Sequence, residues 1–279
     1  MPIIFSTCWY ILKAKFEPEI YRYWIHNMLY NVNMYYLVIY TDEASLHYIT
    51  PYVSNQKIKV IIKPLEEFYN YKYKEQWINN HIINYSIKDR VNWQVNMLWS
   101  EKIYFIEETI QQQHFIDVIH EPDMNNNEIM YGWCDIGYFR GRQYDMNMDE
   151  LKFWPKKDKI NALARDKIHY GCVNNDSNYV NYIFNLVNNK NEKGLPIIQL
   201  PPDLNTIGGG FFILHESKVN LWKELYDKTL KTYFDNGYLV KDDQTIITDC
   251  IFSNMIHFEI HREHNEKYDT WFLFQRLLM

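Results

Sequence analysis

Three largely apolar runs near the start of the chain predict strands that are buried on both faces. They lie at residues 3–12, 36–40 and 57–63, and each is followed by a polar residue or a proline. Continuous apolar runs of this length are typical of the strands of a parallel sheet. Residues 19–29, between the first two runs, carry apolar side chains at helical spacing. This alternation of strand and helix predicts an α/β fold.

A long amphipathic helix is predicted over residues 92–110, with one lysine on its apolar face. Lys102 lies between Trp99 and Ile106 on the stripe of side chains that should face the core. A lysine there extends its amine to solvent, pairs with an acid or meets an anionic ligand, and these alternatives remain open. Residues 70–77 fit neither pattern. The remaining expected elements are loops at residues 111–127 and 145–159, strands at 168–173 and 256–262, and helices at 174–194, 218–234 and beyond 244.

The aromatic run at residues 131–140 is the strongest candidate for a strand with a function. It carries Asp135 in its middle and Gly137 two residues later. Aromatic residues favour a buried strand, in which an uncompensated carboxylate is costly. Gly137 would let a ligand or another backbone approach closely. The pattern indicates either a metal or diphosphate site at a strand end, or a turn that begins at Asp135.

Three consecutive glycines, at residues 208–210, lie directly before Phe211 and Phe212. They are not a phosphate-binding loop, because no Gly-Lys-Ser/Thr follows them. They would allow the backbone to approach a ligand or a neighbouring strand, and a glycine hairpin or bulge fits equally well.

Two adjacent acids, Asp242 and Asp243, precede a predicted helix. Acids at the start of a helix ordinarily cap it and interact with its dipole. Either one could also act as a catalytic base. Both interpretations stay open from these residues alone.

Residues 256–262 alternate with a period of two, which places His257, Glu259 and His261 on one face of a strand. The pattern indicates either ordinary polar surface or a site for a divalent metal.

Composition narrows the range of protein classes. The chain has 279 residues, of which 47% are hydrophobic and 17% aromatic, and a net charge of -6. It can therefore bury a core, and it has no basic cluster interleaved with aromatics that would indicate nucleic-acid binding. No apolar run approaches the ~20 residues of a membrane span. The first residues do not resemble a signal peptide and the four cysteines are widely spaced, so we expect a cytoplasmic protein with reduced core thiols.

The order of these motifs resembles the GT-A-type nucleotide-sugar glycosyltransferases. More narrowly, it is similar to the HtrL/YibB-like proteins, including relatives carried by large DNA viruses. The resemblance implies one GT-A-like domain over residues 1–279, with a mixed, mainly parallel central sheet flanked by helices. Residues 1–140 would then bind the nucleotide sugar and residues 141–279 the acceptor. The motifs that carry the resemblance are Asn92-Trp93, Asn96 to Trp99, Lys102, Trp133 to Tyr138, Gly208 to Phe212 and Asp242 to Gln244.

The same resemblance implies roles for individual residues. The donor-binding residues would be Thr7, Tyr10, Asp42, Lys102, Asp135 and Gly137. The acceptor would lie against Gly209, Gly210 and Phe211, and Mn²⁺ or Mg²⁺ would be bound by Asp135, His257 and His261. The base would be Asp243 or Asp242, and we favour Asp243. Gly137 departs from the family pattern, because it stands where the second acid of a D-x-D motif is expected.

The expected activity is transfer of a sugar from a UDP- or GDP-linked donor to a hydroxyl group of a glycan or glycoprotein. Such a site needs a cation at the leaving diphosphate and a base at the acceptor. The location would be the cytoplasm, or the host cytoplasm for a viral protein. One alternative is a GT-A-like protein that binds a sugar or nucleotide without catalysis, which Gly137 favours. Another is a metal hydrolase that uses His257, Glu259 and His261.

Overall fold

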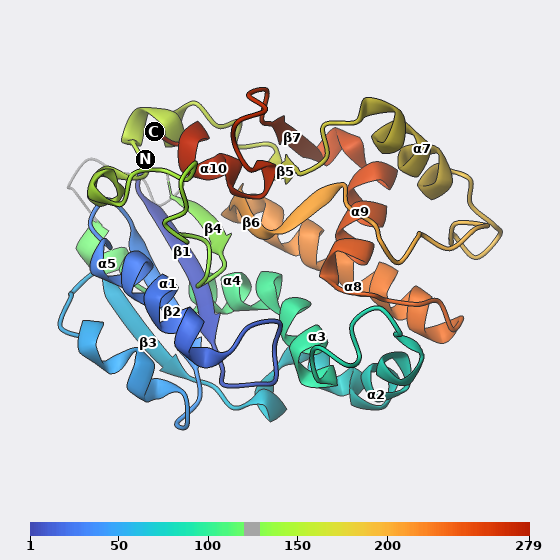
Figure 1. Ribbon diagram of the computed structural model, residues 1–279, viewed down its shortest axis with the longest axis horizontal. Coiled ribbons are helices and arrows are strands. Elements are labelled where there is room, and N and C mark those ends of the chain that lie inside the picture. The colour runs from blue at the N-terminus through green and yellow to red at the C-terminus, as the bar shows by residue number, and fades with distance from the viewer. Residues whose placement is uncertain (120–128) are drawn as a thin grey trace.

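A computed structural model, which describes residues 1–119 and 129–279, contains within these residues a single mixed sheet of seven strands (Figure 1). The strands are β1 (Ile3–Trp9), β2 (Tyr36–Thr41), β3 (Ile58–Ile62), β4 (Met130–Cys134), β5 (Ile168–Cys172), β6 (Ile207–His215) and β7 (Phe258–Arg262). Their order is β3-β2-β1-β4-β6-β5-β7. Strand β6 is antiparallel to both neighbours and all other pairs are parallel. The predicted fold class is confirmed, and the arrangement is consistent with a GT-A-like domain.

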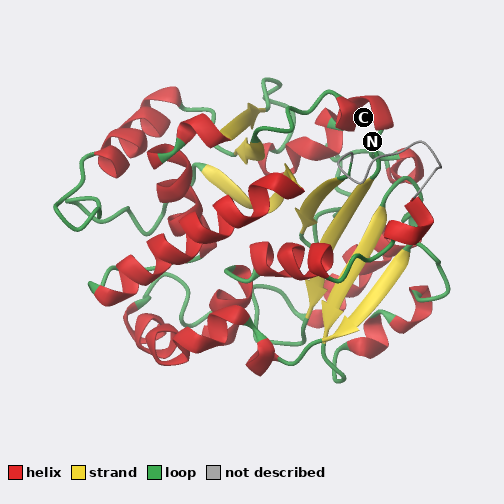
Figure 2. Cartoon of the chain, turned by 180° about the vertical axis from the view of Figure 1, so that it is seen from behind, coloured by secondary structure: helices red, strands yellow, loops and turns green. Residues whose placement is uncertain are grey.

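Helices cover both faces of this sheet (Figures 1 and 2). One face packs against α4, α8 and α9, and the other against α1 and α10. The helices are α1 (Pro18–Tyr30), α2 (Lys74–Ile83), α3 (Trp93–Trp99), α4 (Lys102–Gln111), α5 (Ile116–Ile119), α6 (Lys157–Asn161), α7 (Ser177–Asn188), α8 (Val219–Asp235), α9 (Asp243–Ser253) and α10 (Leu273–Leu277). Coverage on both faces is what parallel strands require.

Strand β2 shows why the apolar runs are continuous. Leu37 and Ile39 belong to the core on the α1 side, whereas Val38 and Tyr40 belong to the core on the α4 side. Successive side chains of a strand point to opposite faces, so a strand between two cores is apolar at every position.

The helix predicted over residues 92–110 is two helices, and that prediction was wrong. Helix α3 ends at Trp99 and α4 begins at Lys102. At the break, the Asn70 side-chain amide donates to the Ser100 carbonyl at 2.9 Å. The Glu101 carboxylate accepts hydrogen bonds from the backbone N–H groups of Tyr69 and Asn70. Hydrogen bonds to residues so distant along the chain do not change the spacing of apolar residues, so the sequence pattern could not reveal the break.

Several other elements differ in extent from the prediction. Residues 70–77 form a short 3₁₀ helix, η4 (Tyr69–Tyr73), and the start of α2. The predicted loop at 111–127 contains α5, and its residues 120–127 lie outside the described residues. The region 145–159, expected to be irregular, contains η6 (Met148–Phe153) and the start of α6. The last strand begins only at Phe258, because His257 belongs to η8 (Met255–His257).

All four cysteines are buried and free. Within the described parts of the chain, no helix combines the length and apolar character needed to cross a membrane.

Candidate functional site

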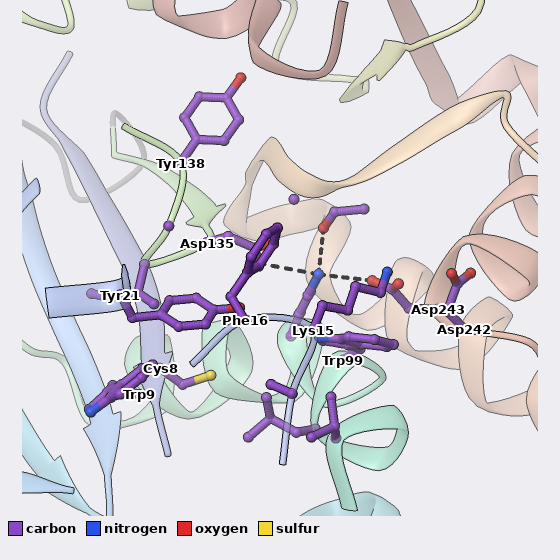
Figure 3. Close-up of a pocket in the computed structure, with 18 of the residues that line it drawn as sticks. Cys8, Trp9, Lys15, Phe16, Tyr21, Trp99, Asp135, Tyr138, Asp242 and Asp243 are labelled. Atoms are coloured by element: carbon purple, nitrogen blue, oxygen red, sulfur yellow. Dashed lines mark hydrogen bonds and ion pairs between the residues drawn. The ribbon is translucent and has the colours of Figure 1, made fainter. Parts of the chain in front are cut away.

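A pocket of about 360 Å³ opens where β1 and β4 end (Figure 3). These strands are parallel neighbours, so their carboxyl ends lie side by side. In α/β sheets, ligands bind in crevices outside the carboxyl ends of the strands. Eight of the predicted site residues line this pocket: Tyr10, Lys102, Asp135, Gly137, Gly209, Gly210, Asp242 and Asp243.

Lys102 lies at the centre of these residues and is buried. Its Nζ donates to the Gly209 carbonyl at 2.7 Å and to Asp243 Oδ2 at 2.9 Å. The same nitrogen lies 3.3 Å from Asp135 Oδ1. Burial opposes the charge of the amine, but the two carboxylates outweigh it and raise the Lys102 pKa above its ordinary value. Lys102 is therefore a buried ammonium held between two acids, and does not extend to solvent.

Asp135 follows β4 directly and is held in place from two sides. Trp133 Nε1 donates to its Oδ1 at 2.6 Å, and its backbone N–H donates to the Gly210 carbonyl at 2.9 Å. The side chain remains 42% exposed. A carboxylate fixed by neighbours yet open on one side is suited to contact a ligand. The backbone of Asp135 also begins the turn that the sequence allowed as an alternative, because the Tyr138 N–H donates to the Asp135 carbonyl at 2.8 Å.

The two acids at the start of α9 have different surroundings, although both are buried. Asp243 is paired with Lys102. Neither carboxylate oxygen of Asp242 has a hydrogen-bond partner among the described residues, and its nearest cation is Lys241 Nζ at 3.1 Å. Burial raises the Asp242 pKa, the Lys241 charge opposes this rise and the Asp243 charge adds to it.

Asp242 occupies the N-cap position of α9, but its side chain makes no capping hydrogen bond. Helix capping therefore does not explain this residue. Asp242 is a buried carboxylate whose charge is compensated by Lys241, and buried acids with shifted pKa values concentrate at functional sites.

The glycine run brings the β6 backbone against the acids. A Cβ at Gly209 would lie 2.5 Å from Asp243 Oδ2, and one at Gly210 would lie 3.1 Å from Asp135 Oδ2. At Gly208 it would meet Val173 at 2.9 Å. The run lies inside β6, so it is not a hairpin. The pairing of β5 with β6 shifts in register between Tyr170 and Cys172, opposite these glycines, which agrees with the bulge that the sequence also allowed.

Cationic and aromatic side chains line the pocket above Lys102. Lys15 Nζ lies 4.7 Å from the centre of the Trp99 ring. The Arg140 guanidinium lies 4.4 Å from the Trp24 ring, and its Nε donates to the Gly137 carbonyl at 3.2 Å. Sequence reasoning missed Lys15 and Arg140 as site residues. Arg140 ends the aromatic run at 131–140, and this could have indicated it, whereas no pattern marks Lys15.

Five predicted site residues do not line the pocket. Thr7 is buried within β1, and Phe211 stacks on Phe274 with ring centres 4.5 Å apart. Asp42 Oδ1 accepts a hydrogen bond from the Ser45 N–H at 2.8 Å, in the turn after β2. His257 and His261 are also absent from the residues that line the pocket.

The surroundings of Asp135 do not fit the predicted Mn²⁺ or Mg²⁺. Oδ1 is already engaged by Trp133 and Lys102, and Gly137 offers no side-chain ligand. Neither predicted histidine lines this pocket. The Lys102 ammonium, between Asp135 and Asp243, already places a positive charge beside the Asp135 carboxylate.

His261 lies in a second cluster instead. Its partners are Glu259, which the sequence predicted, and His169, which it did not. His257 is not part of this cluster. Finding His169 from sequence would have required the pairing of β5 with β7.

Comparison of the sequence with models of protein families and with curated proteins finds no match.

Proposed function

We propose that this protein is a glycosyltransferase that moves a sugar from a UDP- or GDP-linked donor to a hydroxyl group of a glycan or glycoprotein. The observation that carries the proposal is the buried Lys102 ammonium, held by Asp135 and Asp243 at the carboxyl ends of parallel strands. The sheet order and the aromatic lining of the pocket support it. The cytoplasm, or the host cytoplasm for a viral protein, is the location that the family resemblance implies.

The chemistry requires positive charge where the diphosphate leaves. When the acceptor oxygen attacks the anomeric carbon, the bond from that carbon to the diphosphate breaks and negative charge develops on the phosphate oxygens. Preorganised cations in a pocket shielded from water stabilise such charge strongly. Lys102, Arg140 and Lys15 all line the pocket and can serve this purpose. The aromatic rings offer stacking surfaces for the base and the sugar.

The transfer also needs a group that takes the proton of the acceptor hydroxyl. Asp243, the acid preferred from sequence, is already engaged by the Lys102 ammonium, which donates a hydrogen bond to its Oδ2 at 2.9 Å. Asp242 is paired with Lys241 rather than with Lys102, and burial raises its pKa, which brings it nearer to the working pH. We therefore assign the base to Asp242 and the positioning of Lys102 to Asp243.

The test is calorimetric titration of the protein with a panel of UDP- and GDP-sugars, followed by measurement of released UDP or GDP with candidate acceptors. Each assay is run with EDTA and with added Mn²⁺. We expect binding and release by the wild-type protein, and weaker donor binding by Lys102→Met. Lys159→Met, an exposed lysine on α6, is the matched control and should behave as wild type. Absence of binding to every donor in the panel would refute the proposal.

A second candidate is a GT-A-like protein that binds a nucleotide or sugar without catalysis. Gly137 in place of an acid and the pairing of Asp243 with Lys102 favour it. Donor binding that Lys102→Met weakens, with no release of nucleotide under any acceptor or metal condition, would select this candidate over the enzyme.

A further inference from the structure

A second group of ionisable side chains lies on strands β5 and β7, outside the pocket. The two strands are parallel neighbours, with His169 opposite Glu259 and Gly171 opposite His261. A Cβ at Gly171 would lie 2.7 Å from Leu273 of α10, and the His261 ring lies 5.5 Å from the Phe274 ring. The group therefore lies on the face of the sheet that α10 covers. His169 is fully buried, whereas the Glu259 side chain is 46% exposed and keeps one side open to solvent.

The three side chains converge on a small space. His169 Nδ1 lies 3.0 Å from His261 Nε2 and 3.4 Å from Glu259 Oε2. One ligand atom from each residue lies within 4.8 Å of the others. In tetrahedral zinc sites, nitrogen and oxygen ligands lie about 2.0–2.2 Å from the metal, which separates the ligand atoms by roughly 3.3–3.6 Å. Small side-chain movements would bring these atoms to such a geometry.

A backbone contact behind His169 fixes the form of its ring. Nε2 lies 2.9 Å from the Ala164 carbonyl, which can only accept a hydrogen bond. Nε2 therefore carries the proton, and the Nδ1 lone pair points at His261 and Glu259. Histidines that bind metals usually donate their other N–H to a carbonyl or carboxylate in this way.

We infer that His169, Glu259 and His261 bind a divalent transition metal, with zinc the best match, and leave a fourth position for water on the exposed side. Two imidazoles and one carboxylate form a ligand set that suits zinc. The metal would fasten the edge strand β7 to β5. This site is independent of the proposed glycosyl transfer, since none of its residues lines the pocket.

The experiment uses the full chain, stripped with a chelator and then titrated with Zn²⁺ by calorimetry. We expect one zinc per chain and a rise in the melting temperature on zinc addition. His261→Gln and Glu259→Gln, both on the more exposed strand, should weaken zinc binding by more than the roughly 10–100-fold that loss of a supporting hydrogen-bond partner costs. Co²⁺ in place of zinc should give the intense visible absorption of a tetrahedral site in the wild-type protein only.

Two matched controls locate the metal. His257→Gln removes a nearby histidine outside the cluster, and Asp135→Asn removes the acid of the pocket, so both should bind zinc as the wild type does. Stoichiometric binding that Asp135→Asn abolishes would place the metal in the pocket and overturn the inference. Absence of zinc binding by the wild type, or full affinity in both His261→Gln and Glu259→Gln, would overturn it as well.

Discussion

Lys102 shows how far one residue can be interpreted from sequence. A lysine on the apolar face of a helix is unusual. The sequence therefore predicted three alternatives for its amine: extension to solvent, a pair with an acid, or contact with an anionic ligand. The structure shows the pair, because Asp135 and Asp243 hold the ammonium from two sides. The partners could not be predicted, since they come from positions distant along the chain that only the strand order brings together. Lys15 and His169 escaped detection for the same reason.

Replacing Lys102 by Met should lower both stability and donor affinity. Methionine keeps the apolar stem of the side chain, but removing one partner of a buried ion pair costs about 3–5 kcal/mol because the remaining charge is left unpaired. Loss of a charge-assisted hydrogen bond to the diphosphate should weaken donor binding by about 1–3 kcal/mol. Urea unfolding and calorimetric titration measure the two effects, with Lys159→Met as control. Reduced stability with unchanged donor binding would show that Lys102 is purely structural.

The two acids of α9 should separate in function. Asp242→Asn should lower the transfer rate about 10²–10⁴-fold, the range for loss of a general base, and leave donor binding near normal. Asp243→Asn should instead weaken donor binding, because it releases one restraint on the Lys102 ammonium. Nucleotide release and donor titration on both variants give the answer. If Asp243→Asn is inactive but binds donor normally, and Asp242→Asn remains active, then Asp243 is the base.

At the scale of elements, the strands were easier to predict than the helices. Strand β2 is apolar on both faces, and this signal is local. The break between α3 and α4 depends on hydrogen bonds from Asn70 and Tyr69 to Ser100 and Glu101, which lie some thirty residues further along the chain. Apolar spacing continues across the break, so periodicity could not reveal it.

The break also makes a prediction about pH. Burial raises the pKa of Glu101 to about 7, although hydrogen bonds from Asn70 and Tyr69 oppose the rise. An unfolded glutamate has a pKa of about 4.3. Between these values the unfolded chain has lost a proton that the folded protein keeps. The contribution of Glu101 to stability is therefore fully present below about pH 4.3 and is lost as pH rises to about 7, at up to about 1.4 kcal/mol per pH unit.

Glu101→Gln should remove this contribution. Urea unfolding at pH 5, 6 and 7 should show the difference in stability between wild type and variant changing with pH, to the disadvantage of the wild type as pH rises. Glu66→Gln replaces an exposed glutamate nearby and is the control. Its free energy of unfolding should change with pH as that of the wild type does. A difference that stays constant over this range would mean that Glu101 titrates at its ordinary value.

At the scale of the whole molecule, the sheet is made of two contiguous blocks joined at one seam. Strands β3, β2, β1 and β4 come from residues 1–140, and β6, β5 and β7 from residues 141–279. The antiparallel pair of β4 and β6 joins them. Sequence patterns predicted an α/β fold and most of the strands, and the family resemblance implied the mixed, mainly parallel sheet. They could not predict this order, because pairing depends on chain reversals that carry no local signal, and the order is what places Gly209 beside Asp243 and Lys102.

The site lies across this seam, and so we expect the two blocks to unfold together. Lys102 and Asp135 come from the first block, and Gly209 and Asp243 from the second. Away from the sheet, the Asn96 amide donates to the Lys241 carbonyl at 3.0 Å and the Tyr226 hydroxyl donates to Ser100 Oγ at 2.8 Å. Separating the blocks would break the β4–β6 ladder, these bonds and a buried ion pair at once. One cooperative transition follows from such coupling.

Thermal or urea unfolding followed by tryptophan fluorescence and by far-ultraviolet circular dichroism should therefore give coincident curves. A ligand that binds only the folded state, present at about 100 times its Kd, adds about 2.7 kcal/mol to the free energy of unfolding. A nucleotide sugar at that concentration should therefore stabilise the whole protein by this amount in a single transition. Lys102→Met at the same donor concentration should shift less, since it binds more weakly. Two separate transitions, with the donor moving only one of them, would show instead that residues 1–140 form a donor-binding unit that is stable on its own.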